Sequence, residues 1–189
     1  MELIENKTFD KVNFTDSPLP KGEYELCVFK NCDFSNTDLS NIKFIECEFL
    51  ACNLSLATLA QTAFRDAKFK DCKMLGLLFY NCHPFGFTVS FDTCNLNHSS
   101  FYQRKMKKTS FLHSRLNEVD FTECDLTGSV FDNCDFANAK FENTLLEKAD
   151  FRTSFSYSID PDLNHINKAK FSLANIAGLL DKYDLEIEP

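Results

Sequence analysis

The residues best suited to chemistry in this sequence are its cysteines and histidines. The chain of 189 residues contains nine cysteines and four histidines. Thiolate and imidazole groups bind zinc, and a thiolate is also a strong nucleophile. No CxxC or CxxH pair occurs, however, and the sequence lacks the motifs of serine hydrolases, phosphate-binding loops and dinucleotide-binding folds. We therefore expect no enzyme, no metal site and no cofactor.

The spacing of the cysteines indicates a role in the fold and not in chemistry. Many are separated by multiples of five residues, and so are most of the 21 phenylalanines. Large apolar residues recur in steps of five from Phe9 to Phe79 and again from Phe91 to Phe151, with the second set displaced by two residues. A helix repeats about every 3.6 residues and a half-buried strand about every 2. A period of five predicts instead a chain that turns a corner at each pentapeptide.

Eight of the nine cysteines lie two residues before one of these pentapeptide centres, and Cys82 lies two residues before a centre at Pro84. Other repeats have alanine, serine or threonine in this slot. A narrow four-sided coil leaves room there only for a small side chain, so we interpret the cysteines as buried core residues. Cysteines twenty residues apart, such as Cys27 and Cys47, would stack within reach of a disulfide, but a reducing compartment disfavours that bond. The histidines are not twenty residues apart, so they do not form a column.

The repeats also agree with each other residue by residue. Copies include Cys32-Asp33-Phe34-Ser35-Asn36 and Cys134-Asp135-Phe136-Ala137-Asn138. From residue 9 to about residue 155 the sequence resembles the pentapeptide-repeat family. The resemblance implies an all-β solenoid, a right-handed quadrilateral β-helix, here of about seven coils over residues 1–155. Asparagine and aspartate after the centres are expected to form the corners, because they tolerate left-handed backbone conformations.

Two extra residues interrupt the period between Phe79 and Phe91, which predicts a register shift near residues 80–91. Glycine can absorb a change of direction, so we expect a bulge or kink that divides the rod into two stacks. The candidate hinge consists of Pro84, Phe85, Gly86 and Phe87. Either the two phenylalanines project as a contact or both rings pack against the rod.

The repeat fades after Phe151, and residues 156–189 are expected to form a C-terminal cap. Helical spacing predicts a helix over about residues 172–183 with Ser172 as its N-cap, followed by an edge strand over Asp184–Glu188. A cap is needed because an uncovered last coil exposes an open backbone ladder. Either this helix only caps the solenoid of its own chain, or it also joins two chains into a homodimer. The candidate cap and dimer residues are Leu173, Ile176, Leu179 and Leu180.

The net charge of -8 disfavours direct nucleic-acid binding, but the charges are unevenly distributed. Residues 93–116 contain five basic residues and no acid, whereas residues 117–151 contain nine acids and two lysines. Aspartates directly before a centre are interpreted as turn residues. The candidate basic patch is Arg104, Lys105, Lys107 and Lys108, and the candidate acidic partner surface is Glu118, Glu123, Asp132, Glu142 and Glu147.

The segment Ile159–Ile166 is similar to the link between solenoid and C-terminal helix in the Qnr-type and microcin-immunity branch of the family. That resemblance implies a homodimer joined through C-terminal helices, whose acidic surface mimics DNA, binds DNA gyrase or topoisomerase IV and modulates quinolone or toxin sensitivity. The long loops of many Qnr-type rods are missing from this sequence. The alternative is a scaffold that binds another protein, with the basic patch as its anchor.

No apolar run approaches the eighteen or so residues that a membrane span requires, and the start of the sequence does not resemble a signal peptide. We therefore expect a cytoplasmic location without membrane contact.

Overall fold

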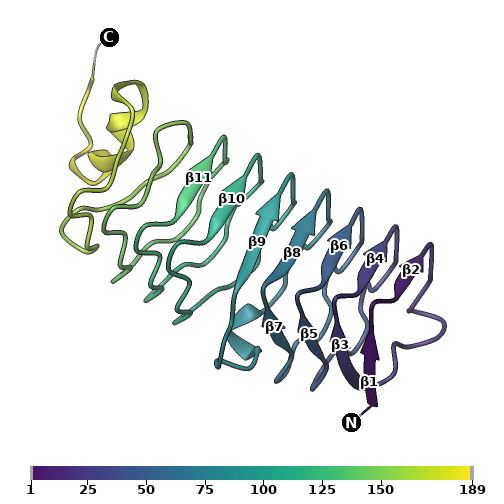
Figure 1. Cartoon of the computed structure of the whole chain (residues 1–189). Helices are drawn as coiled ribbons and strands as arrows, with labels where there is room; N and C mark the ends of the chain where they lie inside the picture. Colours follow the sequence, from purple (N-terminus) through teal and green to yellow (C-terminus); the bar gives the residue numbers. More distant parts are fainter. Residues whose placement is uncertain (1, 188–189) are drawn as a thin grey trace.

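The pentapeptide period produces coils of twenty residues, each with four sides. The computed structural model describes residues 2–187, so Met1, Glu188 and Pro189 lie outside it. Neighbouring coils stack in parallel, and a strand residue pairs with the residue twenty positions later, as Phe9 does with Phe29. The result is a rod with the two chain ends at opposite ends (Figure 1). It is the right-handed, four-sided all-β solenoid that the sequence predicts.

Two of the four faces carry strands. We number the faces 1 to 4 in the order in which the chain passes them in each coil. Face 1 carries a four-stranded parallel sheet of β1 (Glu2–Glu5), β3 (Gly22–Glu25), β5 (Lys43–Ile45) and β7 (Ala63–Arg65). Face 2 carries a seven-stranded parallel sheet of β2 (Thr8–Asp10), β4 (Val28–Lys30), β6 (Glu48–Leu50), β8 (Ala67–Lys70), β9 (Val89–Asp92), β10 (Ser110–Leu112) and β11 (Val130–Asp132). Faces 3 and 4 are held together by turns and isolated parallel bridges.

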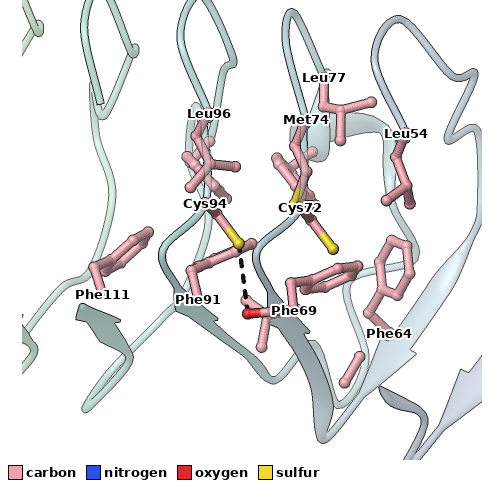
Figure 2. Packing of buried hydrophobic residues seen from close by; sticks show 14 of the residues in the cluster. Leu54, Phe64, Phe69, Cys72, Met74, Leu77, Phe91, Cys94, Leu96 and Phe111 are labelled. Atoms are coloured by element: carbon pink, nitrogen blue, oxygen red, sulfur yellow. Dashed lines mark hydrogen bonds between the residues drawn. The ribbon is translucent and has the colours of Figure 1, made fainter. Parts of the chain in front are cut away.

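The core consists of columns of aromatic and aliphatic side chains, one column behind each face. Behind face 2, Phe9 begins an unbroken column of stacked rings that ends at Phe171, with centroids 4.6 to 5.5 Å apart. Figure 2 shows Phe69, Phe91 and Phe111 in this row. Each stacked pair contributes about 0.5–1.5 kcal/mol beyond the burial of its area. Seven coils separate Phe9 from Phe151, in agreement with the number expected from the repeats.

Most corners are left-handed at the second residue after the centre, whatever residue type occupies that position; Asp16, Lys21 and Thr153 are among the exceptions. Asn31 and Asn36 have φ values of 53° and 56°, but so do residues that gain nothing from their side chain, such as Leu26 and Ala51 at 53° and 52°. The geometry of the coil therefore imposes the conformation. The aspartates before the centres act as the sequence predicts, because the Asp135 carboxylate accepts the amide of Ala137 at 3.2 Å.

The two-residue insertion changes the stacking register from 20 to 22. Phe49 pairs with Phe69, and Phe69 then pairs with Phe91. The sheet on face 1 ends here, and the chain forms the 3-10 turn η1 (Phe79–Asn81) and a loop that projects from the rod (Figure 1). The expectation that the insertion divides the rod into two stacks is wrong for face 2, because β8 and β9 pair across it and the ring column continues.

The C-terminal cap differs from the expected single helix. Parallel bridges continue past residue 155 as far as the pair Asp150 and Lys170. The expected helical segment is two 3-10 helices, η2 (Leu173–Leu179) and η3 (Asp181–Tyr183). Ser172 occupies the N-cap, but its side chain makes no capping hydrogen bond. The expected edge strand is not formed over residues 184–187, and Glu188 lies outside the described residues.

Packing against the last coil explains how the cap is held. The amide of Ile159 donates to the carbonyl of Gly178 at 2.9 Å, and Asn175 Nδ2 donates to the carbonyl of Ser154 at 3.1 Å. A Cβ atom on Gly178 would lie 2.1 Å from the carbonyl oxygen of Tyr157, so only glycine fits this approach. Across residues 2–187, no helix has the length and apolar character required to cross a bilayer.

Candidate functional site

The cysteines belong to the core, as predicted. All nine are buried and free. Eight of the thiols, all but that of Cys82, donate to carbonyls of the preceding coil, as Cys94 Sγ does to Phe69 at 3.5 Å (Figure 2). Burial raises the pKa of Cys47 to about 12, so this thiol stays protonated. No group of three or more histidine, cysteine, aspartate or glutamate residues is arranged to hold a metal within the part of the chain that the structure describes.

The basic patch must be corrected, because Arg104 is buried with only 6% of its surface exposed. Its guanidinium donates to the carbonyl of Tyr80 at 2.6 Å and to that of Cys82, and lies 5.2 Å from the ring centroid of Phe87. In regular coils the carbonyl at the position of Cys82 accepts an amide of the next coil, as that of Arg104 does from Asp125. The displaced loop removes that partner, and the guanidinium replaces it. Burial lowers the pKa of Arg104.

The other members of the basic patch lie on the surface of face 1. Lys105, Lys107 and Lys108 are all exposed. Lys107 forms an ion pair of 3.2 Å with Asp125 of the next coil. Among residues 2–187, no carboxylate lies within ion-pair distance of Lys105 or Lys108.

The candidate acids are distributed over all four faces. Glu142 lies on face 4 and Glu123 at the corner of faces 4 and 1, and the amide of Glu123 donates to the carbonyl of Glu142 at 2.8 Å. Glu147 belongs to face 1 and accepts the hydroxyl of Thr127. The structure therefore brings together only two of the five predicted acids.

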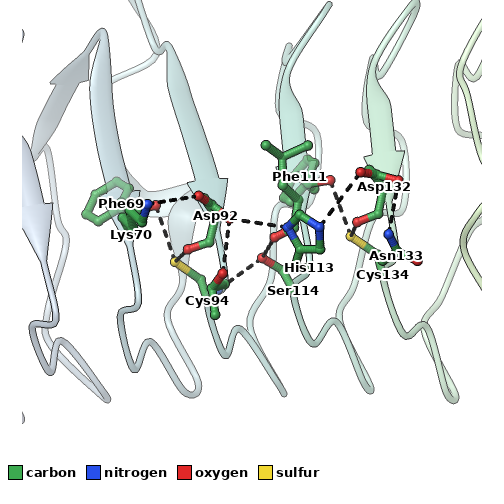
Figure 3. Close-up of polar contacts among 12 residues, drawn as sticks. Phe69, Lys70, Asp92, Cys94, Phe111, His113, Ser114, Asp132, Asn133 and Cys134 are labelled. Carbon is green, nitrogen blue, oxygen red and sulfur yellow. Dashed lines mark hydrogen bonds and ion pairs between the residues drawn. The ribbon is translucent and has the colours of Figure 1, made fainter.

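The remaining two acids take part in contacts between coils. At the corner of faces 3 and 4, Glu118 pairs with His98 at 3.2 Å. On face 2, Asp132 accepts the hydroxyl of Thr153 at 2.7 Å and lies 3.9 Å from His113. Figure 3 shows Lys70, Asp92, His113 and Asp132 in line along the rod. In this ladder Asp92 faces Lys70 on one side, and the ring of His113 lies between the carboxylates of Asp92 and Asp132.

The loop of the insertion presents one phenylalanine and buries the other. Phe85 is 71% exposed, whereas Phe87 is 8% exposed. The guanidinium carbon of Arg65 lies 5.3 Å from the centroid of the Phe85 ring. Gly86 has a φ of 69°, and Pro84 is exposed beside it. Neither sequence interpretation is correct for both rings, since one projects and the other packs.

The cap residues likewise divide into two groups. Ile176, Leu179 and Leu180 are half-buried, and Leu179 packs against the core of the solenoid. Leu173 is 88% exposed. Further exposed apolar side chains near the end of the chain are Tyr183, Leu185 and Ile187.

Sequence reasoning missed two features. Arg104 lies two residues before the centre Met106, the slot for small side chains, and this position signals its burial. The second feature is a group of exposed apolar side chains on face 4, Leu78, Tyr80 and Tyr102. Tyr80 and Tyr102 are 22 residues apart, so they occupy adjacent coils only when the insertion is included in the count.

Comparisons with known proteins agree with this geometry. No curated protein sequence matches the chain. A trypsin-treated variant of QnrB1, a plasmid-mediated fluoroquinolone resistance protein, superposes with a TM-score of 0.76 at 16% identity and covers 100% of this chain and 92% of its own. HetL, a pentapeptide-repeat protein involved in heterocyst differentiation regulation from the cyanobacterium Nostoc sp. strain PCC 7120, has a TM-score of 0.60 at 13% identity over 90% and 87% of the two chains. Both likenesses establish the fold.

The family profile described as "Pentapeptide repeat region" matches residues 23–85 and 87–151. The gap between these two matches falls at Gly86, in the loop of the insertion. Together the two matches cover more than half of the sequence. The chain therefore belongs to the pentapeptide-repeat family.

Proposed function

We propose that this protein is a non-catalytic, protein-binding rod in the cytoplasm and that its partner is a type II topoisomerase, DNA gyrase or topoisomerase IV. The closed core of stacked rings favours a function carried by the outer faces. The observation that carries the proposal is the likeness to a fluoroquinolone resistance protein over the whole chain, combined with acids on the coils next to the cap.

A DNA-like surface would be located on face 4 of the last coils. Asp120, Glu123 and Glu142 lie there on adjacent coils, together with Lys140, which pairs with Glu142. Coils rise by about 4.8 Å, whereas duplex DNA carries one charge about every 1.7 Å along its axis. The rod is therefore much less densely charged than DNA. Binding to a basic protein surface would depend on the pattern of these acids and would be weakened by salt.

A homodimer joined at the caps would lengthen this acidic face. The exposed Leu173, Tyr183, Leu185 and Ile187 supply apolar surface for such contact. Light scattering on the full chain is expected to give the mass of two chains. The variant Leu173→Asp is expected to give one chain, and a monomeric starting protein would contradict the dimer.

The direct test is a supercoiling assay with purified DNA gyrase, with and without a quinolone. The wild-type chain is expected to inhibit supercoiling or to relieve the drug. Charge reversal on face 4, Glu123→Lys with Glu142→Lys, is expected to abolish the effect. The matched control on face 1, Glu147→Lys, is expected to retain it. Absence of any effect of the wild-type chain on both topoisomerases would refute the topoisomerase proposal.

A second candidate function is a scaffold for a different protein, anchored at Lys105 and Lys108. The observation in its favour is that neither lysine forms an ion pair among residues 2–187. Pull-down with Lys105→Glu and Lys108→Glu together separates the two proposals. Loss of a partner other than a topoisomerase would support the scaffold.

A further inference from the structure

The middle of face 4 differs from the rest of the surface in its composition. Leu78, Tyr80 and Tyr102 are 41%, 42% and 37% exposed, although aromatic residues elsewhere in the coils are mostly buried. Leu78 is bridged to Ser100, so these side chains belong to two adjacent coils and form one patch. Tyrosine is among the residue types enriched at the centre of protein interfaces.

Charge is also missing from this part of face 4. Its outward residues over three coils are Thr58, Ala60, Leu78, Tyr80, Ser100 and Tyr102. None of them is charged. The next coil begins with Asp120, which is bridged to Ser100, and the face continues to Glu123 and then to Lys140 and Glu142, which pair with each other. An uncharged aromatic centre bounded on one side by acids has the arrangement of an interface core with a charged rim.

The patch is held in place by the structure beneath it. Arg104 fixes the backbone carbonyl of Tyr80 from inside the rod. The hydroxyl of Tyr102 lies 3.4 Å from Glu123, whose carboxylate also accepts the side-chain amide of Gln103 at 2.8 Å. A surface that is already ordered loses less entropy when a partner binds.

We infer that the middle of face 4 is the docking site for a positively charged segment of a partner protein that also carries apolar side chains. The apolar side chains pack against Tyr80 and Tyr102, and the basic groups face Asp120, Glu123 and Glu142. This inference rests on the proposal that the chain acts by binding a protein. Charge complementarity selects a basic partner over a second copy of this chain, whose C-terminal coils are acidic.

The experiment measures binding of the full chain to two kinds of probe: the purified topoisomerases, DNA gyrase and topoisomerase IV, and a short synthetic peptide of alternating arginine and leucine. The double variant Tyr80→Ser with Tyr102→Ser is expected to weaken binding to each probe by about tenfold or more per tyrosine. The matched control Leu26→Ser, an exposed apolar residue at the corner of faces 1 and 2, is expected to bind like the wild type. Because all three side chains are exposed, circular dichroism and melting are expected to be unchanged.

A second variant leaves both rings in place. Ala60→Lys introduces into the patch a charge of the same sign as the partner, and is expected to weaken binding. Peptides of alternating arginine and serine, or glutamate and leucine, are expected to bind weakly, because each lacks one of the two required features.

The outcomes separate this inference from the topoisomerase proposal. If a topoisomerase binds equally to the wild type and the double variant, the docking site is wrong while the topoisomerase proposal stands. If only the arginine-leucine peptide binds, and does so in a tyrosine-dependent way, the docking site stands and the topoisomerase proposal fails. If the wild type binds neither kind of probe, both are overturned.

Discussion

Faces 2 and 4 are built from the same repeat, yet their outer surfaces differ. On face 2, charges pair from coil to coil, as Lys68 does with Glu48 at 3.1 Å and Lys70 with Asp92 at 3.6 Å. On face 4, uncharged aromatic residues lie beside acids, and no strand forms. Charges that pair with each other leave little net charge for a partner. On face 4, Glu142 pairs with Lys140, but Asp120 and Glu123 form no ion pair among residues 2–187. Pairing along the rod therefore distinguishes face 2 from face 4, the proposed binding face.

The largest expected effect tests whether faces 2 and 4 are backed by equally well packed core residues. Phe111 lies behind face 2 and Phe101 behind face 4, and both side chains are fully buried. Replacing either by alanine is expected to destabilise the protein by about 3–5 kcal/mol, since a large cavity is left in a packed core. Urea unfolding measures both. A loss near zero for Phe101→Ala would show that face 4 has no equivalent core.

The second prediction concerns the buried side chain that supports the edge of face 4. Arg104→Met is expected to cost about 2–4 kcal/mol, because two buried carbonyls lose their donor. The neighbouring exposed change Lys105→Met is expected to stay within about 0.5 kcal/mol. Hydrogen exchange of the loop at residues 82–88 is expected to accelerate only in Arg104→Met. Equal stability of the two variants would contradict the structural role of Arg104.

The smallest expected effect depends on pH and distinguishes the charges of the two faces. A hydrogen bond from the Arg152 side chain lowers the pKa of Asp150 on face 2. Because the folded pKa lies below the unfolded value of about 3.9, this contribution is present above about pH 4 and is lost as the pH falls through the folded pKa. Asp150→Asn is expected to be less stable by up to about 1 kcal/mol at pH 7, with no difference at low pH.

Glu142→Gln on face 4 is the comparison variant for Asp150→Asn. Its pair with Lys140 at 3.3 Å is exposed, so the change is expected to stay within about 0.5 kcal/mol at every pH. Urea unfolding from pH 7 to pH 2 measures both variants. An effect of Glu142→Gln as large as that of Asp150→Asn would remove the distinction between the two faces.

The fold could be predicted because every pentapeptide carries the same pattern of core and surface residues. The step of five from Phe9 to Phe79 indicates the coil, and cysteine in the small slot independently indicates which side faces inward. The site was predicted less well. Acids close together in the sequence, such as Glu118 and Glu123, point outward from different edges of the rod, because five residues turn the chain to the next face. Nearness in sequence therefore does not imply a shared surface in a solenoid.

The sequence by itself determined the period, the core columns, the burial of the nine cysteines and the position of the insertion. These features are local and repeated, so each pentapeptide specifies its own inward and outward side chains. Only the tertiary structure decided that Arg104 is buried, that Phe85 projects while Phe87 packs, and that Tyr80 and Tyr102 share a patch. Each of these depends on how one coil stacks on the next after a two-residue shift. That stacking is a contact between residues about twenty positions apart, which no single repeat contains.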